Sequence, residues 1–305
     1  MDKNLSAPDL VAFQVERLGS DTLGNAVSIL QNAEIHHLES LFLYWRKNPP
    51  DLEGLVKACC DDVGFSEQKQ RMINVSAVMA AEDNGNDYHN NHHFREVFAL
   101  MYMMAFDGYR KGRITKEHFA RRLSAALLHD YKHDGLTNNS HGEHQQFRLE
   151  QQAFDEAHLR LVFEGGATQK DLRIIEAMIL STDVSAPNKP DAVSPADSLK
   201  NYVEHGGRDV LLLHPKLRVL HDENLVDTAL LLHDADIAVS AAISPYMNVV
   251  QGKALQKEWN FPKLPDQGFF LSVLCRSQLY SRSARELLQP AMNDVLAHYG
   301  LDCVA

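Results

Sequence analysis

The stretch Glu82–Val97, which reads EDNGNDYHNNHHFREV, predicts the fold of this chain. Its core is Tyr88-His89-Asn90-Asn91-His92-His93, and an apolar run follows it. One stripe of helical spacing contains His89, His93, Val97, Leu100 and Met104. A helix with this pattern would place histidines on the face that its apolar residues bury. The stretch therefore predicts a buried helix with metal ligands at its start.

Two further segments carry ligand-type residues at the end of apolar helical patterns. One is His129-Asp130, followed one helical turn later by His133, and the other is His233-Asp234-Ala235-Asp236. The apolar stripes that lead into them contain Phe119, Leu123, Ala126 and Leu127, and Leu225, Ala229 and Leu232. Carboxylates are rarely buried unless they are paired or bind an ion. We therefore expect the three segments to converge on a pair of divalent metal ions.

Composition limits the other possibilities. The chain has 305 residues, of which 45% are hydrophobic, and a net charge of −11 without a run of Lys or Arg. This acidity argues against nucleic acid or an anionic membrane as the partner. We expect one domain over 1–305, with an N-terminal helical part at 1–65 and a catalytic core at 66–305. The oligomeric state is left open by the sequence.

Cysteine usage and the absence of targeting patterns suggest a cellular location. The four cysteines form no CxxC motif and no disulfide framework, which predicts reduced thiols. The N-terminus has no apolar signal-peptide region, and no apolar run of membrane-spanning length occurs. We therefore expect a soluble, cytoplasmic protein. The cysteines are Cys59, Cys60, Cys275 and Cys303.

The chain is predicted to be all-α, a compact multi-helix domain. Alternating β-type patterns are nearly absent, and Thr168 with Asp171 predicts a capping box. A long loop with three prolines is expected near 184–195. The helices are expected near 8–32, 34–47, 51–63, 66–82, 89–111, 115–133, 145–164, 168–182, 196–205, 215–240, 245–258 and 268–299.

Motifs of other enzyme classes are missing from the sequence. It contains no GxGxxG, no Walker GxxxxGK[ST], no GxSxG and no HExxH pattern. The segment His141-Gly142-Glu143-His144 lies in a polar stretch, and we interpret it as a solvated loop. The remaining signal is that of a metal-dependent phosphohydrolase.

These residues resemble a known family. EDNGNDYHNNHHFREV is similar to the YHNxxHxxDV signature of the mammalian-type (class I) cyclic nucleotide phosphodiesterases, a branch of the HD-domain superfamily. HDYKHDGLTNN resembles the HDxxHPGxxN motif of that family, and LLHDADIA resembles its HxADxS segment. Ser181-Thr182-Asp183 matches the TD element, and Asp266–Phe270 resembles the stretch that carries a purine-binding glutamine. The matches run in order over about two thirds of the chain.

The resemblance implies a role for each matching position. Four ligands would hold one metal ion, zinc, and Asp130 would also bridge to a second ion, magnesium or manganese. His89 would be the general acid. His133 and Glu150 would complete the catalytic set, with Thr182 and Asp183 close to the metals. Gln267 would bind the base, with Phe269 or Phe270 stacked on it. The implied metal ligands are His93, His129, Asp130 and Asp236.

The implied activity is hydrolysis of a 3′,5′-cyclic nucleotide, a small-molecule substrate, to the 5′-monophosphate. A hydroxide that bridges two cations would attack phosphorus, and His89 would protonate the leaving oxygen. Two alternatives stay open: an HD-type hydrolase of nucleoside monophosphates or of alarmones such as guanosine tetraphosphate, and a non-catalytic HD scaffold. The sequence does not choose between cyclic AMP and cyclic GMP.

The sequence also departs from the family pattern. His133-Asp134-Gly135 replaces the family's HPG, and a histidine usually found after the Leu149-Glu150 pair is missing. The stretches from Asp130 to Glu150 and from Asp236 to Gln267 are shorter than those of the family. These departures concern the nucleotide pocket more than the metal ligands.

Overall fold

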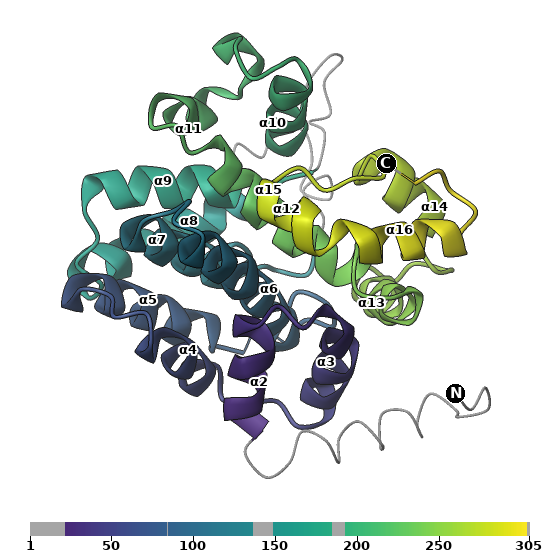
Figure 1. The fold of residues 1–305 in the computed structure, drawn as a ribbon, viewed down its shortest axis with the longest axis horizontal. Coiled ribbons are helices and arrows are strands. Elements are labelled where there is room, and N and C mark those ends of the chain that lie inside the picture. The colour runs from purple at the N-terminus through teal and green to yellow at the C-terminus, as the bar shows by residue number, and fades with distance from the viewer. Residues whose placement is uncertain (1–21, 84, 137–148, 185–192, 304–305) are drawn as a thin grey trace.

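All regular secondary structure in the computed structural model is helical within the ranges that it describes, 22–83, 85–136, 149–184 and 193–303 (Figure 1). No strand occurs in these ranges, so the all-α prediction is confirmed. The predicted loop at His141–His144, the first part of the helix expected at 8–32 and most of the loop near 184–195 lie outside the described residues.

The described helices have the following bounds. The α-helices are α2 (Thr22–Gln31), α3 (Leu38–Lys47), α4 (Leu52–Asp61), α5 (Glu67–Ala80), α6 (Asn91–Arg110), α7 (Lys116–Leu128), α8 (Leu149–Phe163), α9 (Gln169–Leu180), α10 (Pro195–Glu204), α11 (Arg218–Asp222), α12 (Val226–Ala241), α13 (Pro245–Glu258), α14 (Gln267–Phe269), α15 (Arg282–Leu287) and α16 (Gln289–His298). The 3-10 helices are η1 (Ile35–His37), η3 (Val210–Leu212) and η4 (Pro215–Leu217), and η5 (Phe270–Leu274) is a π-helix.

Helices α6 and α12 form the centre of the core. Both are buried along most of their length and pack against each other. Figure 1 shows α7, α8 and α9 on one side of this pair and α13, α14 and α16 on the other. One cluster of buried apolar side chains extends from Ala26 in α2 to Leu296 in α16. The single-domain assignment of 1–305 and its division at residue 65 stay predictions.

Two of the predicted long helices are broken, so these predictions were wrong. The helix expected at 215–240 is interrupted after α11, where Asn224 adopts a left-handed backbone with φ 54°. The helix expected at 268–299 is interrupted at Arg276 and Ser277, with φ 53° and 57°. Neither break contains glycine or proline, so the sequence gives no ordinary turn signal there.

All four cysteines are free; Cys59, Cys60 and Cys275 are buried, and Cys303 is exposed. Among the residues that the structure describes, no helix is both long and apolar enough to cross a membrane.

A buried carboxylate joins three helices of the core. Thr168 and Asp171 form the predicted capping box at the start of α9. The carboxylate of Asp171 is fully buried and also accepts hydrogen bonds from Lys69 Nζ of α5 at 2.6 Å and Arg121 Nε of α7 at 2.7 Å. Although burial disfavours its charge, the Lys69, Thr168 and Arg121 contacts hold the pKa of Asp171 well below its usual range.

We expect Asp171→Asn to destabilise the fold by about 3–5 kcal/mol, because two buried cations lose their carboxylate. Urea unfolding at neutral pH measures this. The stabilisation is present above the unfolded aspartate pKa of about 3.9 and is lost as the pH falls toward the lower folded value. The gap between wild type and variant should therefore narrow below about pH 4. Asp294→Asn, at an exposed position of α16, is the control. An equal loss in both variants would contradict the assignment.

Candidate metal centre and catalytic pocket

The first ligand segment contains the cap of a helix, so that only its last part lies within the helix. Asn90 is the N-cap of α6, and its side chain accepts hydrogen bonds from the amides of His92 and His93. His93 therefore lies in the first turn of α6, where it is 1% exposed. His89 precedes the cap and is not on the helix, so the predicted stripe through His89 and His93 was wrong. The cap turns the two histidines in different directions, which allows them different roles.

The second ligand segment lies just beyond the end of α7. The predicted helix to residue 133 was wrong, because α7 ends at Leu128 and Lys132 has a left-handed backbone with φ 59°. His129 is fully buried, and its Nδ1 lies 2.8 Å from the carbonyl oxygen of Ala126. Because a carbonyl oxygen only accepts, Nδ1 carries a proton, and Nε2 is the nitrogen that faces the other ligand atoms. His129 is thus oriented with Nε2 as the nitrogen available to bind a metal ion.

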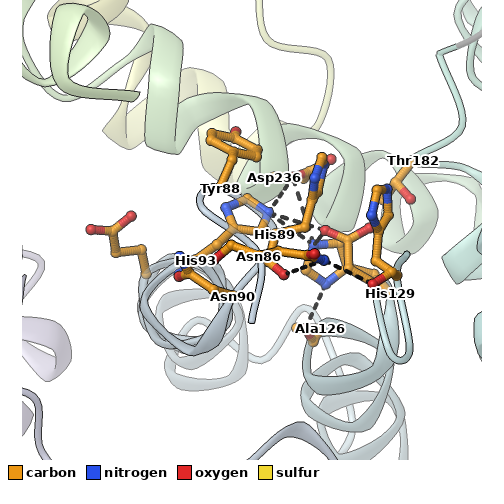
Figure 2. Close-up of polar contacts among 12 residues, drawn as sticks. Asn86, Tyr88, His89, Asn90, His93, Ala126, His129, Thr182 and Asp236 are labelled. Atoms are coloured by element: carbon orange, nitrogen blue, oxygen red, sulfur yellow. Dashed lines mark hydrogen bonds and ion pairs between the residues drawn. The ribbon is translucent and has the colours of Figure 1, made fainter. Parts of the chain in front are cut away.

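Side chains from three parts of the chain converge on one point (Figure 2). His93 Nε2 lies 3.3 Å from Asp130 Oδ2 and 3.2 Å from Asp236 Oδ1. His129 Nε2 lies 3.0 Å from Asp130 Oδ2 and 3.2 Å from His93 Nε2. Ligand atoms of His93, His129 and Asp236 all lie within 4.8 Å of one another. The four residues expected to bind metal are therefore brought together.

The electrostatics of this group fit a bound cation. Burial alone would lower the pKa of His93, but Asp130 and Asp236 outweigh it and raise the pKa to about 9. Burial would raise the pKa of Asp236, yet His129 and His93 hold it well below its usual range. The two carboxylates need positive charge beside them, which protonated imidazoles or a cation between the four side chains can supply. A divalent cation supplies that charge to a nitrogen and oxygen ligand set of this kind.

Beside the metal ligands, His89 is held by a carboxylate that the sequence analysis missed. Glu258, in the last residue of α13, places Oε1 2.5 Å from His89 Nδ1. Its Oε2 accepts hydrogen bonds from the backbone amides of Tyr88 and His89 at 2.6 and 2.9 Å. The side chain of Glu258 is only 3% exposed. Because Glu258 ends a largely polar helix and belongs to none of the recognised motifs, no sequence signal distinguished it.

His133 lies against His89 instead of continuing α7. The two rings stack with centroids 3.8 Å apart, and burial, followed by the charge of His89, lowers the pKa of His133 to about 4. Asn86 joins the two segments, because its Nδ2 donates to the backbone oxygens of His133 and His89 at 2.8 and 3.3 Å. Gly135 has φ 76°, and a Cβ there would lie 2.8 Å from Asn86 Oδ1. The glycine is therefore required for this contact.

The other predicted catalytic positions lie around the same centre. Glu150, in the first turn of α8, and Thr182, just after α9, line the cavity next to the metal ligands. The Thr182 hydroxyl donates to the Ile179 carbonyl oxygen at 2.8 Å. Asp183 is fully buried, and its backbone oxygen accepts from the amide of Ala196. Glu150 and Thr182 thus border the site without belonging to the closest group of ligand atoms, and Asp183 is not among the described residues that line the cavity.

The cavity has a volume of about 490 Å³ and extends from the metal ligands to Gln267. Gln267 is 8% exposed, and its Nε2 donates to the carbonyl oxygen of Pro265 at 3.0 Å. A Cβ at position 252 would lie 2.9 Å from the same nitrogen, so Gly252 lets the amide pack against α13. These two contacts fix the orientation of the glutamine.

The residue before Gln267 caps the short helix α14. Asp266 is the N-cap of α14 and accepts from the amide of Phe269 at 3.1 Å. The Gln267 amide instead contacts Pro265 and Gly252. Phe269 is 54% exposed and Phe270 is half-buried, and both line the cavity.

A buried hydrogen-bond network next to the metal ligands on α6 was also missed. Glu96, 1% exposed, accepts from Arg46 Nε and Nη2 at 3.1 Å each and from Gln251 Nε2 at 2.6 Å. Arg46 Nη2 donates to Gln251 Oε1 at 2.9 Å. Gln251 lines the cavity and Glu96 lies one turn after His93. The network therefore connects α3 to both the metal ligands and the cavity wall.

Of the segment His233–Asp236, only the last residue reaches the centre. His233 is buried, and because burial disfavours the charged imidazolium, its pKa is lowered to about 3. Asp234 is fully buried and points elsewhere, with its carboxylate accepting from the backbone amides of Tyr280 and Ser281. The third predicted ligand segment thus contributes Asp236 to the metal centre and Asp234 to a separate contact.

Comparison with known proteins gives matches in structure but not in sequence. No protein-family model matches the chain, and no curated protein matches it. The phosphodiesterase domain of the RhoPDE fusion protein from the choanoflagellate Salpingoeca rosetta is 20% identical, with a TM-score of 0.59 over 82% of this chain and 89% of that chain. A second structure of the rhodopsin phosphodiesterase domain from Salpingoeca rosetta is 22% identical, with a TM-score of 0.59 over 82% and 87%. The chain therefore has the all-α fold of these phosphodiesterase domains.

Proposed function

We propose that this protein is a metal-dependent phosphodiesterase that hydrolyses a 3′,5′-cyclic nucleotide to the 5′-monophosphate. The observation that carries the proposal is the convergence of His93, His129, Asp130 and Asp236 at the end of a cavity that is also lined by His89, which is paired with Glu258. The fold shared with phosphodiesterase domains supports the same reaction class.

The metal ions would be held by the four converging residues. The mixed nitrogen and oxygen set suits zinc, and Asp130 has a second oxygen for magnesium or manganese. When bound, such cations lower the pKa of water and offset the charge that develops on a phosphate. The buried carboxylates and imidazoles keep these cations at one end of the cavity.

The remaining chemistry is proton transfer to the leaving group. Hydrolysis adds water to phosphorus and breaks the bond to the 3′ oxygen, which must take up a proton. We assign this proton to His89 Nε2, because Glu258 occupies Nδ1 and fixes the orientation of the ring. Glu258 is in this assignment a positioning residue. The stacked His133 ring limits movement of His89 from its other side.

The apolar part of the cavity would hold the nucleoside. Gln267 lies there with Phe270 and the more exposed Phe269, so a base could stack on a ring and meet an amide at its edge. We therefore favour a cyclic nucleotide over the nucleoside monophosphates and alarmones that other HD-type enzymes hydrolyse, and over a non-catalytic scaffold.

The deciding experiment is an activity panel on the purified full chain with Mg²⁺ or Mn²⁺. The substrates are cyclic AMP, cyclic GMP, a nucleoside monophosphate, guanosine tetraphosphate and bis(p-nitrophenyl) phosphate. Formation of a 5′-monophosphate from a cyclic nucleotide supports the proposal. Hydrolysis of only the monophosphate or the tetraphosphate, or of no substrate at all, rejects it.

Metal binding is tested by removing one ligand at a time. We expect His93→Ala and Asp236→Ala each to lower the metal content and the thermal stability, because the remaining buried ligands are left without their partners. Elemental analysis and thermal unfolding measure the two effects. His298→Ala, at an exposed position of α16, serves as the control. Full metal occupancy in both ligand variants would refute the assignment.

The role of His89 as general acid is distinguished from that of a metal ligand by the effect of its removal on turnover. We expect His89→Ala to keep its metals and to lose about 10²–10⁴-fold in kcat on a cyclic nucleotide. The loss should be much smaller on bis(p-nitrophenyl) phosphate, whose leaving group needs no proton. Glu258→Gln should show a smaller loss with the same preference between substrates. Equal losses of His89→Ala on the two substrates would remove His89 from this role.

Gln267→Ala tests the base contact. Loss of a hydrogen bond in a closed pocket costs about 1–3 kcal/mol, so kcat/KM for the cyclic nucleotide should fall by roughly 5–150-fold. Hydrolysis of bis(p-nitrophenyl) phosphate, which has no purine base, should be unchanged. If kcat/KM stays the same for every cyclic nucleotide, Gln267 does not contact the base.

A further inference from the structure

The segment that follows α14 and η5 has an unusual backbone. The short helix α14 continues as the π-helix η5, which ends at Leu274. Arg276 and Ser277 follow with φ 53° and 57°. Two successive non-glycine residues in the left-handed region cost free energy, and such a conformation persists only where its surroundings impose it. The turn at Arg276 and Ser277 is therefore held by its contacts.

One face of α10 makes those contacts. Arg276 Nη1 donates to Glu204 Oε2 at 2.7 Å and to Asn201 Oδ1 at 3.0 Å, and Nη2 donates to Asp197 Oδ1 at 3.1 Å. Positions 197, 201 and 204 have the i, i+4, i+7 spacing of a single helix face. Three acceptors on one rigid face match the planar guanidinium, which can donate to all of them at once. A single surface ion pair would hold the arginine less firmly.

A buried lysine of the same helix, Lys200, holds Leu274, which lies two residues before Arg276. Lys200 has a side chain only 1% exposed, and its Nζ donates to the carbonyl oxygen of Leu274 at 2.8 Å. Leu274 is the last residue of η5 and lines the cavity. Helix α10 therefore holds the carboxyl end of η5 at two successive points, Leu274 and Arg276.

The other end of the turn is fixed to the helix that carries a metal ligand. The buried carboxylate of Asp234 accepts from the amides of Tyr280 and Ser281 at 2.6–3.1 Å. Asp234 lies two residues before Asp236 in α12. In addition, the hydroxyl of Tyr280 donates to Glu204 Oε1 of α10 at 2.6 Å. We call residues 274–281 the brace, since they join the cavity wall to α10 and to α12, the helix that carries Asp236.

We propose that Arg276 is a positioning residue that sets the affinity for the base by holding the brace, and with it Gln267 and Phe270, against the cavity. The inference rests on the proposed function. Arg276 lies at the end of the element that carries both cavity residues, and it touches neither the metal ligands nor His89. Loosening the brace should therefore weaken binding of the base and leave the phosphate chemistry intact.

The test compares Arg276→Asn with Arg276→Lys in the full chain. Asparagine tolerates the left-handed backbone but is too short to reach α10, so the variant removes the contacts with little added strain. Lysine keeps the charge and the length. Arg282→Asn is the matched control, because Arg282 is six residues away and its exposed side chain pairs only with Glu286 among the described ion pairs.

We expect Arg276→Asn to raise KM for the cyclic nucleotide by about tenfold, with kcat within about twofold and hydrolysis of bis(p-nitrophenyl) phosphate unchanged. Arg276→Lys, which keeps the charge but not the planar fork, should lie between Arg276→Asn and wild type, and Arg282→Asn should behave as wild type. In the absence of any ligand, hydrogen exchange at 267–277 should be faster in Arg276→Asn, with exchange in α6 and α7 unaltered.

An unchanged KM in Arg276→Asn overturns the proposal, because Arg276 then has no role in binding the base. Equal losses of activity on the cyclic nucleotide and on bis(p-nitrophenyl) phosphate also overturn it, because they indicate a merely structural role. Unchanged exchange at 267–277 overturns it as well. If the wild type hydrolyses no cyclic nucleotide, the proposed function fails, and the exchange measurement alone then decides whether Arg276 holds the brace.

Discussion

The arrangement of the whole chain depends on bringing two imidazoles and two carboxylates together in the interior. Buried charge of this kind is unfavourable unless opposite charge compensates it. His93, His129 and Asp236 come from the start of α6, the end of α7 and the middle of α12, so these helices must meet at one place. Their mutual packing at the centre of the core provides this meeting point.

Two histidines of the site are oriented by partners outside the ligand group. The carbonyl oxygen of Ala126 orients His129 and Glu258 orients His89, while Asn90 caps the helix that carries His93. Except for Asp236, in the middle of α12, the site residues lie at helix ends or in turns. The apolar faces of the same helices supply the stability that holds these residues in place.

Sequence patterns predicted the parts of the site that are local. The spacing of histidine, aspartate and apolar residues identified the three ligand segments and the all-α fold, because a buried stripe leaves a periodic signal. The choice of His93, His129, Asp130 and Asp236 within those segments came from the resemblance to the phosphodiesterase motifs. Contacts between distant segments leave none: Glu258 lies 169 residues from His89, and Arg46 lies 50 residues from Glu96. The breaks at Asn224 and Arg276 were missed since both lack glycine and proline.

Two glycines allow close contacts beside the pocket. Gly135, two residues after His133, has φ 76°, a left-handed conformation that other residues adopt only with strain, and it lies against the Asn86 side chain that joins the two histidine segments. Gly252 of α13 lies against the Gln267 amide, and a Cβ at position 252 would lie 2.9 Å from Gln267 Nε2. A larger side chain at position 252 would therefore push the amide away from α13, so this glycine helps to set the position of Gln267 in the cavity wall.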